Sequence, residues 1–128
     1  MVIKTLEKIL YVEDEMDIQS VAKIAIETVG GFTLKVCSSG DEALNEAESY
    51  APDLFLLDVM MPGLDGPSTL VKLREIASLS QVPAIFMTAK VQSSEIDELL
   101  QLGALGVIPK PFDPMTLATQ IKKIWESQ

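Results

Sequence analysis

The fold is decided by the stretch LFLLDVMMPGLDG, residues 54–66. Its first four residues are all apolar, which is typical of a central strand in a parallel sheet, where both faces are buried. The acid Asp58 follows directly, and a loop containing Pro62 and two glycines leads away from it. The stretch therefore predicts a buried strand that delivers one carboxylate to the edge of a sheet.

The same order, a short apolar run and then a longer stretch of helical periodicity, recurs on both sides of this segment. The other predicted strands are residues 9–12, 32–37, 82–87 and 107–108, and the predicted helices are residues 16–29, 39–50, 67–77 and two that start near residues 93 and 113. Five such βα units predict an α/β fold of the flavodoxin-like (βα)5 class, a doubly wound parallel five-stranded sheet with strand order 2-1-3-4-5. Pro109 cannot donate to a ladder, so the fifth strand should lie at an edge.

Local signals place several helix ends. Gly30-Gly31 is expected to end the first helix as a C-cap pair. Ser94 and Asp97 have the spacing of a capping box in the fourth helix, and Asp113 is expected to cap the last one.

The composition fits one domain, residues 1–128, in which 48% of the residues are apolar. The net charge of −9 disfavours direct nucleic-acid binding and binding to anionic membranes, because no cluster of basic residues interrupts it. A lone cysteine, Cys37, fits a reducing cytoplasm and more often packs in a core than reacts. No apolar stretch reaches the length of a membrane span. We expect a cytoplasmic protein.

Polar residues stand at the carboxyl ends of four predicted strands. These residues are Glu13 and Asp14 after the first strand, Asp58 after the third, Thr88 after the fourth and Lys110 after the fifth. In open parallel sheets, ligands bind at this edge, at the point where the winding direction reverses. With strand order 2-1-3-4-5, that point lies between the first and third strands, so the three acids should converge there.

Three neighbouring carboxylates repel one another unless a cation neutralises them or a proton is retained. Oxygen ligands in a chain that contains no histidine favour Mg²⁺ over Zn²⁺ or a Ca²⁺ cage, and Mn²⁺ should substitute for it. The Lys110 ammonium and the Thr88 hydroxyl would add donors for phosphoryl oxygens. Each residue alone has an ordinary structural explanation, but the set indicates phosphoryl transfer to a carboxylate.

Three segments resemble the receiver domain of bacterial two-component response regulators, and the similarity extends over essentially the whole chain. They are Val12-Glu13-Asp14, residues 57–66, and Lys110-Pro111-Phe112. The resemblance implies that Asp58 accepts a phosphoryl group from a histidine kinase or a histidine-phosphotransfer protein. Such a domain is a signalling switch rather than an enzyme, although it promotes its own phosphorylation and dephosphorylation at Asp58.

The resemblance also implies roles for the neighbouring residues. Asp14, Asp58 and the backbone carbonyl of Met60 would ligate Mg²⁺ directly, while Glu13 would act largely through water. Thr88 and Lys110 would contact the phosphoryl oxygens, and the Lys110-Pro111 bond would be cis.

In receivers the signal reaches a downstream protein when the threonine moves toward the phosphoryl group and the face of the fourth helix, fifth strand and fifth helix repacks. The position three before Lys110 is usually aromatic in this family, but here it is Val107. We therefore expect a weaker or differently transmitted switch. The resemblance also implies a monomer or a weak phosphorylation-dependent dimer.

Met60 and Lys90 occupy the family's variable positions beside the phosphoryl group. Neither offers an amide or an acid to orient an attacking water, so slow self-dephosphorylation is expected. Met60 also argues against an aspartyl-phosphate hydrolase of the haloacid dehalogenase type, which needs a second Asp at this position as acid and base.

The sequence leaves the setting of the domain open. With no room for an output domain in these residues, the chain fits a stand-alone receiver that docks on another protein or relays phosphate. A receiver module cut from a longer regulator would look the same.

Overall fold

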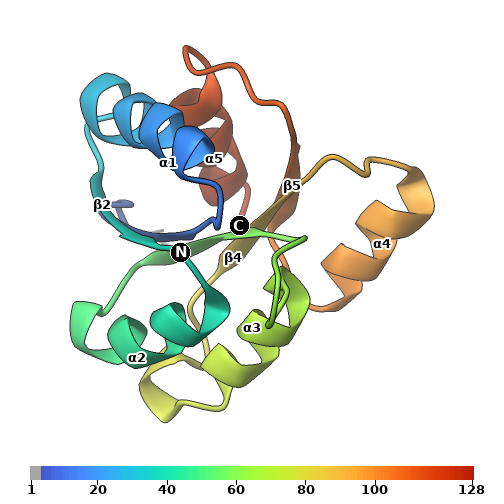
Figure 1. Ribbon diagram of the computed structural model, residues 1–128. Coiled ribbons are helices and arrows are strands. Elements are labelled where there is room, and N and C mark those ends of the chain that lie inside the picture. The colour runs from blue at the N-terminus through green and yellow to red at the C-terminus, as the bar shows by residue number, and fades with distance from the viewer. Residues whose placement is uncertain (1–3) are drawn as a thin grey trace.

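Parallel strands form the centre of the computed structural model, which describes residues 4–128 (Figure 1). They are β1 (Lys8–Val12), β2 (Thr33–Cys37), β3 (Leu54–Asp58), β4 (Ala84–Thr88) and β5 (Gly106–Pro109). The strands pair in the order β2-β1-β3-β4-β5, and every pair is parallel. The predicted topology is confirmed, and β5 lies at an edge.

Helices cover both faces of the sheet, as Figure 1 shows. They are α1 (Met16–Lys23), α2 (Gly40–Tyr50), α3 (Gly66–Arg74), α4 (Ser93–Gln101) and α5 (Leu117–Glu126), with a π-helix, η1 (Ile24–Val29), and a 3-10 helix, η2 (Ala77–Leu79). One face carries α1 and α5, and the other carries α2 and α3, with α4 beside them next to β5. None of the helices described is long and apolar enough to cross a bilayer.

Strand β1 shows how the two cores are divided. Ile9 and Tyr11 belong to the cluster under α1 and α5, whereas Leu10 and Val12 belong to the cluster under α2, α3 and α4. All four side chains are fully buried, because successive residues of a strand point to opposite faces and both faces are covered here.

The first helical segment differs from its prediction. Residues 16–29 are helical throughout, but the α-helix stops at Lys23 and π-helical turns follow. The Gly30 N–H donates to the Ala25 carbonyl, five residues back, at 3.1 Å. Each π turn takes up an extra residue, so Ile26 is buried beside Ala25, while Val29 at the end of the segment is 47% exposed.

The helix-end predictions succeeded in part. Gly31, at φ 76°, confirms the glycine pair as the end of the first helical segment. The capping box in the fourth helix is wrong, because α4 begins after Gln92 and no side chain caps it.

The cap predicted for the last helix is wrong as well. The Asp113 carboxylate accepts from the Met115 N–H at 2.9 Å, and α5 begins four residues after Asp113. This carboxylate stabilises a turn before the helix by accepting from the backbone two residues ahead, and Asp side chains form such bonds readily.

The third helix begins one residue earlier than predicted and ends at Arg74 rather than at residue 77. Asp65 caps it by accepting from the Ser68 N–H at 2.8 Å.

Candidate functional site

Three acids meet at the carboxyl ends of two neighbouring strands. Glu13 and Asp14 follow β1, Asp58 ends β3, and the register pairs Val12 with Leu57. One carboxylate oxygen from each of the three lies within 4.8 Å of the others. Glu13 and Asp58 are buried, and Asp14 is half-buried. The predicted convergence of these acids is therefore confirmed.

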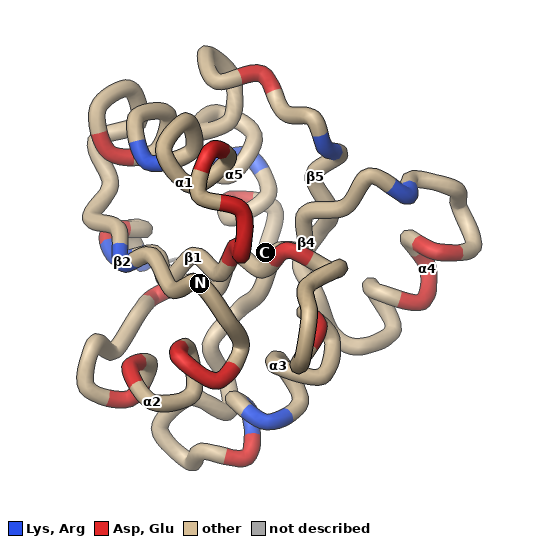
Figure 2. Tube along the Cα trace, in the orientation of Figure 1, with Lys and Arg blue, Asp and Glu red and all other residues tan. Residues whose placement is uncertain are grey.

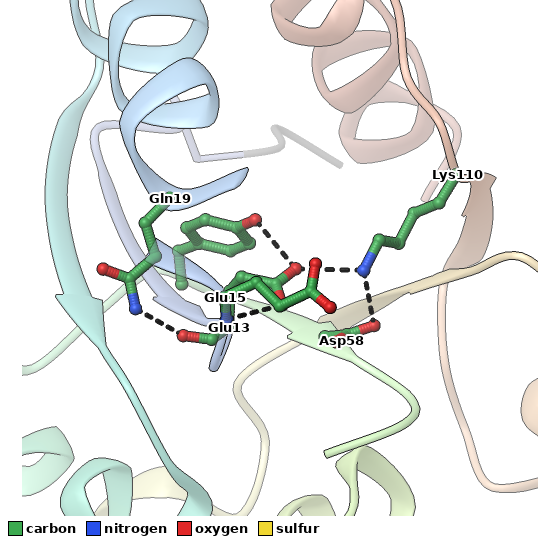
Figure 3. Close-up of polar contacts among 6 residues, drawn as sticks. Glu13, Glu15, Gln19, Asp58 and Lys110 are labelled. Atoms are coloured by element: carbon green, nitrogen blue, oxygen red, sulfur yellow. Dashed lines mark hydrogen bonds and ion pairs between the residues drawn. The ribbon is translucent and has the colours of Figure 1, made fainter. Parts of the chain in front are cut away.

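Lys110 reaches into this cluster from the segment after β5 (Figure 3). Its ammonium lies 3.1 Å from Glu13 Oε1 and 3.2 Å from Asp58 Oδ1. Burial by itself would lower the pKa of Lys110, but the two carboxylates raise it above its ordinary value. The lysine therefore stays charged and is shared between two acids from different strands.

The Asp58 carboxylate stands in an unfavourable environment for its charge. Burial, followed by the nearby Glu13 carboxylate, raises the pKa of Asp58 to about 6, although Lys110 acts in the opposite direction. A buried acid with an excess of negative charge around it attracts a further cation. The cluster is thus compatible with a metal site.

In the described residues, more donors contact Glu13 than either of the other two acids. Its Oε1 accepts from the Tyr11 hydroxyl at 3.4 Å, and its Oε2 accepts from the Glu15 N–H at 3.3 Å. Gln19 on α1 donates to the Glu13 backbone carbonyl at 2.5 Å, as Figure 3 shows. Sequence reasoning missed these supporting groups. The signal for Tyr11 was present, since residues two apart on a strand share a face.

Thr88 is buried at the end of β4, and its hydroxyl oxygen accepts one hydrogen bond. The Oγ1 atom accepts from the Lys90 N–H at 3.0 Å. Next along the edge, the Lys110-Pro111 bond is cis, as the family resemblance implied. The Met60 side chain, in the loop after Asp58, is 63% exposed.

Gly66 packs directly against the end of β3. A Cβ atom at this position would lie 2.4 Å from the Asp58 carbonyl oxygen, and the Gly66 N–H donates to the Val59 carbonyl at 2.9 Å. Only glycine allows so close an approach of the α3 start to the end of β3. The loop after Asp58 is thereby held at both of its ends.

Acidic residues, red in Figure 2, gather where β1 leads into α1 and also lie on α2 and α4. The basic residues of the described chain are spread over several elements rather than collected on one face.

The family model for the response regulator receiver domain matches residues 9–122. The chain belongs to this family. Receiver domains are the signalling switches of two-component systems and interact with kinases and downstream targets. Membership of the family agrees with the resemblance seen in the sequence and with the acidic cluster.

The chain is similar to parts of proteins that are named as transcriptional regulators. The chain is 36% identical to the probable transcriptional regulator ycf27 of Guillardia theta and covers 46% of it, with 95% of this chain aligned. It is 38% identical to the alkaline phosphatase synthesis transcriptional regulatory protein PhoP of Bacillus subtilis and covers 48% of it, with 92% of this chain aligned. The chain thus spans about half the length of these relatives.

Solved receiver structures show the same fold. The chemotaxis response regulator CheY4 of Vibrio cholerae superposes with a TM-score of 0.85 at 26% identity, over 94% of this chain and 99% of that one. A putative response regulator from Chloroflexus aurantiacus superposes with a TM-score of 0.84 at 25% identity, over 95% and 99% of the two chains.

Proposed function

We propose that Asp58 accepts a phosphoryl group from a histidine kinase or a histidine-phosphotransfer protein and that phosphorylation changes the binding of a downstream protein. The observation that carries this proposal is the shared lysine: Lys110 lies 3.1 Å from Glu13 and 3.2 Å from Asp58 at the edge of a parallel sheet. A purely structural ion pair would not need a third carboxylate, Asp14, beside it.

A divalent cation completes this site in the proposal. Carboxylate oxygens without histidine or thiolate ligands fit Mg²⁺, with Mn²⁺ as a substitute. Asp14, Asp58 and the Met60 carbonyl would hold the ion, with Glu13 behind them acting largely through water. The ion supplies positive charge that offsets the repulsion between the carboxylates and the incoming phosphoryl oxygens.

In the transfer step, an Asp58 carboxylate oxygen attacks the phosphorus atom. A phosphorus–oxygen bond forms while the phosphorus–nitrogen bond to the donor imidazole breaks, and the imidazole leaves with the bonding electron pair. Lys110 orients Asp58 before the transfer and binds a phosphoryl oxygen afterwards. Thr88 would donate its hydroxyl proton to another phosphoryl oxygen.

Movement of Thr88 would connect the site to the face formed by α4, β5 and α5. The Thr88 hydroxyl oxygen accepts from the Lys90 N–H, which leaves its own proton available to donate to a phosphoryl oxygen. On the neighbouring strand, Val107 pairs with Phe86 and packs in the core under α4. A short β-branched side chain cannot swing as an aromatic ring can, so backbone movement and helix repacking would transmit the change.

Replacing Val107 tests this part of the proposal. The substitution Val107→Tyr should change the hydrogen-exchange protection of α4 and β5, and the affinity for the downstream partner, in the phosphorylated state only. Equal changes with and without phosphoryl would argue against a switch that passes through this position.

The proposal describes a non-enzymatic switch that acts in the cytoplasm as a monomer or a weak phosphorylation-dependent dimer. It is compatible with a stand-alone receiver, a phosphorelay intermediate or a module of a longer regulator. A hydrolase of the haloacid dehalogenase type would need an acid where Met60 stands.

Intact-mass spectrometry gives the direct test of the acceptor. Incubation with Mg²⁺ and phosphoramidate should add one phosphoryl group to the wild type, and chelation of the metal should prevent the addition. The Asp58→Asn variant should show no addition. An unchanged wild-type mass, or the same gain in the variant, would remove the central claim.

A further inference from the structure

Two donors converge on one oxygen of Glu13. Oε1 accepts from the Tyr11 hydroxyl at 3.4 Å and from the Lys110 ammonium at 3.1 Å, whereas Oε2 accepts from the Glu15 N–H. Tyr11 is fully buried, and its ring is packed in the core under α1 and α5. The phenol is therefore fixed beside Glu13, at a distance longer than the roughly 2.5–3.0 Å of a well-formed hydroxyl hydrogen bond.

The proposed function creates a conflict for this oxygen. Figure 3 shows Lys110 between Glu13 and Asp58, and the same ammonium must turn to a phosphoryl oxygen once Asp58 is modified. Glu13 is completely buried, and a buried carboxylate that loses its cation without another donor is strongly destabilised. When the lysine moves away, the Tyr11 hydroxyl is the other side-chain donor that contacts Oε1 in the part of the chain that the structure describes.

We infer that Tyr11 is a positioning residue whose hydroxyl becomes the main donor to Glu13 Oε1 when Lys110 turns to the phosphoryl group. This inference rests on the proposed function. Burial, followed by the nearby Glu13 carboxylate, raises the pKa of the Tyr11 phenol above its ordinary value, so the hydroxyl keeps its proton at neutral pH and remains a donor. Because the ring is held in the core, its hydroxyl stays close to Glu13 Oε1 and needs no large side-chain movement to donate to it. Departure of the lysine leaves room for the 3.4 Å contact to shorten.

The release of the lysine can be imitated without metal or phosphate by the substitution Lys110→Met. Urea unfolding of the metal-free protein at pH 8 should then be compared for wild type, Tyr11→Phe, Lys110→Met and the double variant. Tyr11→Phe should raise the unfolding equilibrium constant by less than about threefold in the wild type, but roughly tenfold in the Lys110→Met background, as expected for a hydrogen bond to a charged group. Additive effects of the two substitutions would overturn the inference.

Phosphorylation gives a second readout. With Mg²⁺ and phosphoramidate, Tyr11→Phe should slow phosphorylation of Asp58 roughly tenfold, the loss of one such hydrogen bond in the transition state. Its affinity for Mg²⁺ alone, measured by calorimetry, should change by less than about twofold, since Lys110 still serves Glu13 in that state. General damage to the site would weaken both.

Tyr50→Phe is the matched control. The Tyr50 hydroxyl donates to the Thr33 carbonyl at 3.2 Å, away from the acidic cluster, so its removal should leave phosphorylation unchanged. If wild type is not phosphorylated, the proposed function fails, and the role of Tyr11 in phosphorylation fails with it. If wild type is phosphorylated and Tyr11→Phe matches its rate, only the role of Tyr11 is overturned.

Discussion

Two aspartates flank strand β3, and the fold treats them in opposite ways. Asp53, just before the strand, accepts from the Glu7 and Lys8 N–H groups at 3.1 and 2.9 Å and pairs with Lys4 at 2.6 Å. Burial by itself would raise the pKa of Asp53, but these donors together hold it below its ordinary value. Asp58, at the other end, has its pKa raised to about 6 by burial and by Glu13.

The difference lies in the surroundings rather than in the residue. Before β3, the carboxylate faces backbone donors of the segment that leads into β1, so its charge is satisfied and holds the sheet together. After β3, the carboxylate faces other acids, because the carboxyl ends of neighbouring strands all carry polar residues. The same side chain is therefore structural at one end, and at the other it is the residue to which the proposed function assigns a cation and a phosphoryl group.

Exchanging each aspartate for asparagine should show the contrast between them most clearly. Asp58→Asn should abolish phosphorylation and should not destabilise the metal-free protein at neutral pH, because it removes a buried repulsion with Glu13. Asp53→Asn should be phosphorylated at the wild-type rate. Intact-mass kinetics and urea unfolding of both variants test this, and loss of phosphorylation in Asp53→Asn would contradict the assignment.

Truncating Asp53 should show how much stability the other end carries. Asp53→Ala leaves the Glu7 and Lys8 N–H groups without their acceptor and should cost about 2 kcal/mol of unfolding free energy. Chemical denaturation measures the loss, with Asp97→Ala on the exposed surface of α4 as the control. A cost no larger than that of the control would show that Asp53 is not structural.

The lifetime of phosphorylated Asp58 should respond to its flanking residue. Met60→Asn introduces an amide that can orient an attacking water and should shorten the half-life of the phosphorylated form roughly tenfold, the value of about one hydrogen bond. Loss of the phosphoryl mass with time after removal of the donor measures this. An unchanged half-life would mean that position 60 does not control access of water.

Acid should weaken the stabilisation that Asp53 provides, and this is the smallest of the expected effects. Its folded pKa lies below the ordinary value of 3.8, so the folded state binds fewer protons and the stabilisation is complete above about pH 4. It is lost as the pH falls through the folded pKa. The stability difference between wild type and Asp53→Asn should therefore be constant from neutral pH to about pH 5 and shrink below pH 4. A constant difference down to pH 2 would argue against this ion pair.

Sequence reasoning succeeded where a regular rule fixes position. Parallel strands place their carboxyl ends at one edge, so the meeting of Glu13, Asp14, Asp58 and Lys110 followed from strand order without any side-chain detail. The apolar runs fixed the strands for the same reason, since both faces had to be buried.

It failed where local bonds compete. Asp113 has equivalent uses as a helix cap or in a turn, and the π-helix after Lys23 brings Ile26 into the core beside Ala25. The Tyr11 contact with Glu13 depends on side-chain direction and length. Such choices differ by small free energies and are decided by tertiary packing that no local pattern records.

The position of Lys110 also determines when, during synthesis of the chain, the site can be completed. Its ammonium meets Asp58 and Glu13, which lie 52 and 97 residues earlier. Until the fifth strand is added, the first and third strands would bring three acids together with no lysine between Glu13 and Asp58. If the proposed function holds, we therefore expect that a nascent chain that still lacks Lys110 cannot be phosphorylated, so that the ability to accept a phosphoryl group appears only once the fifth βα unit has been synthesised.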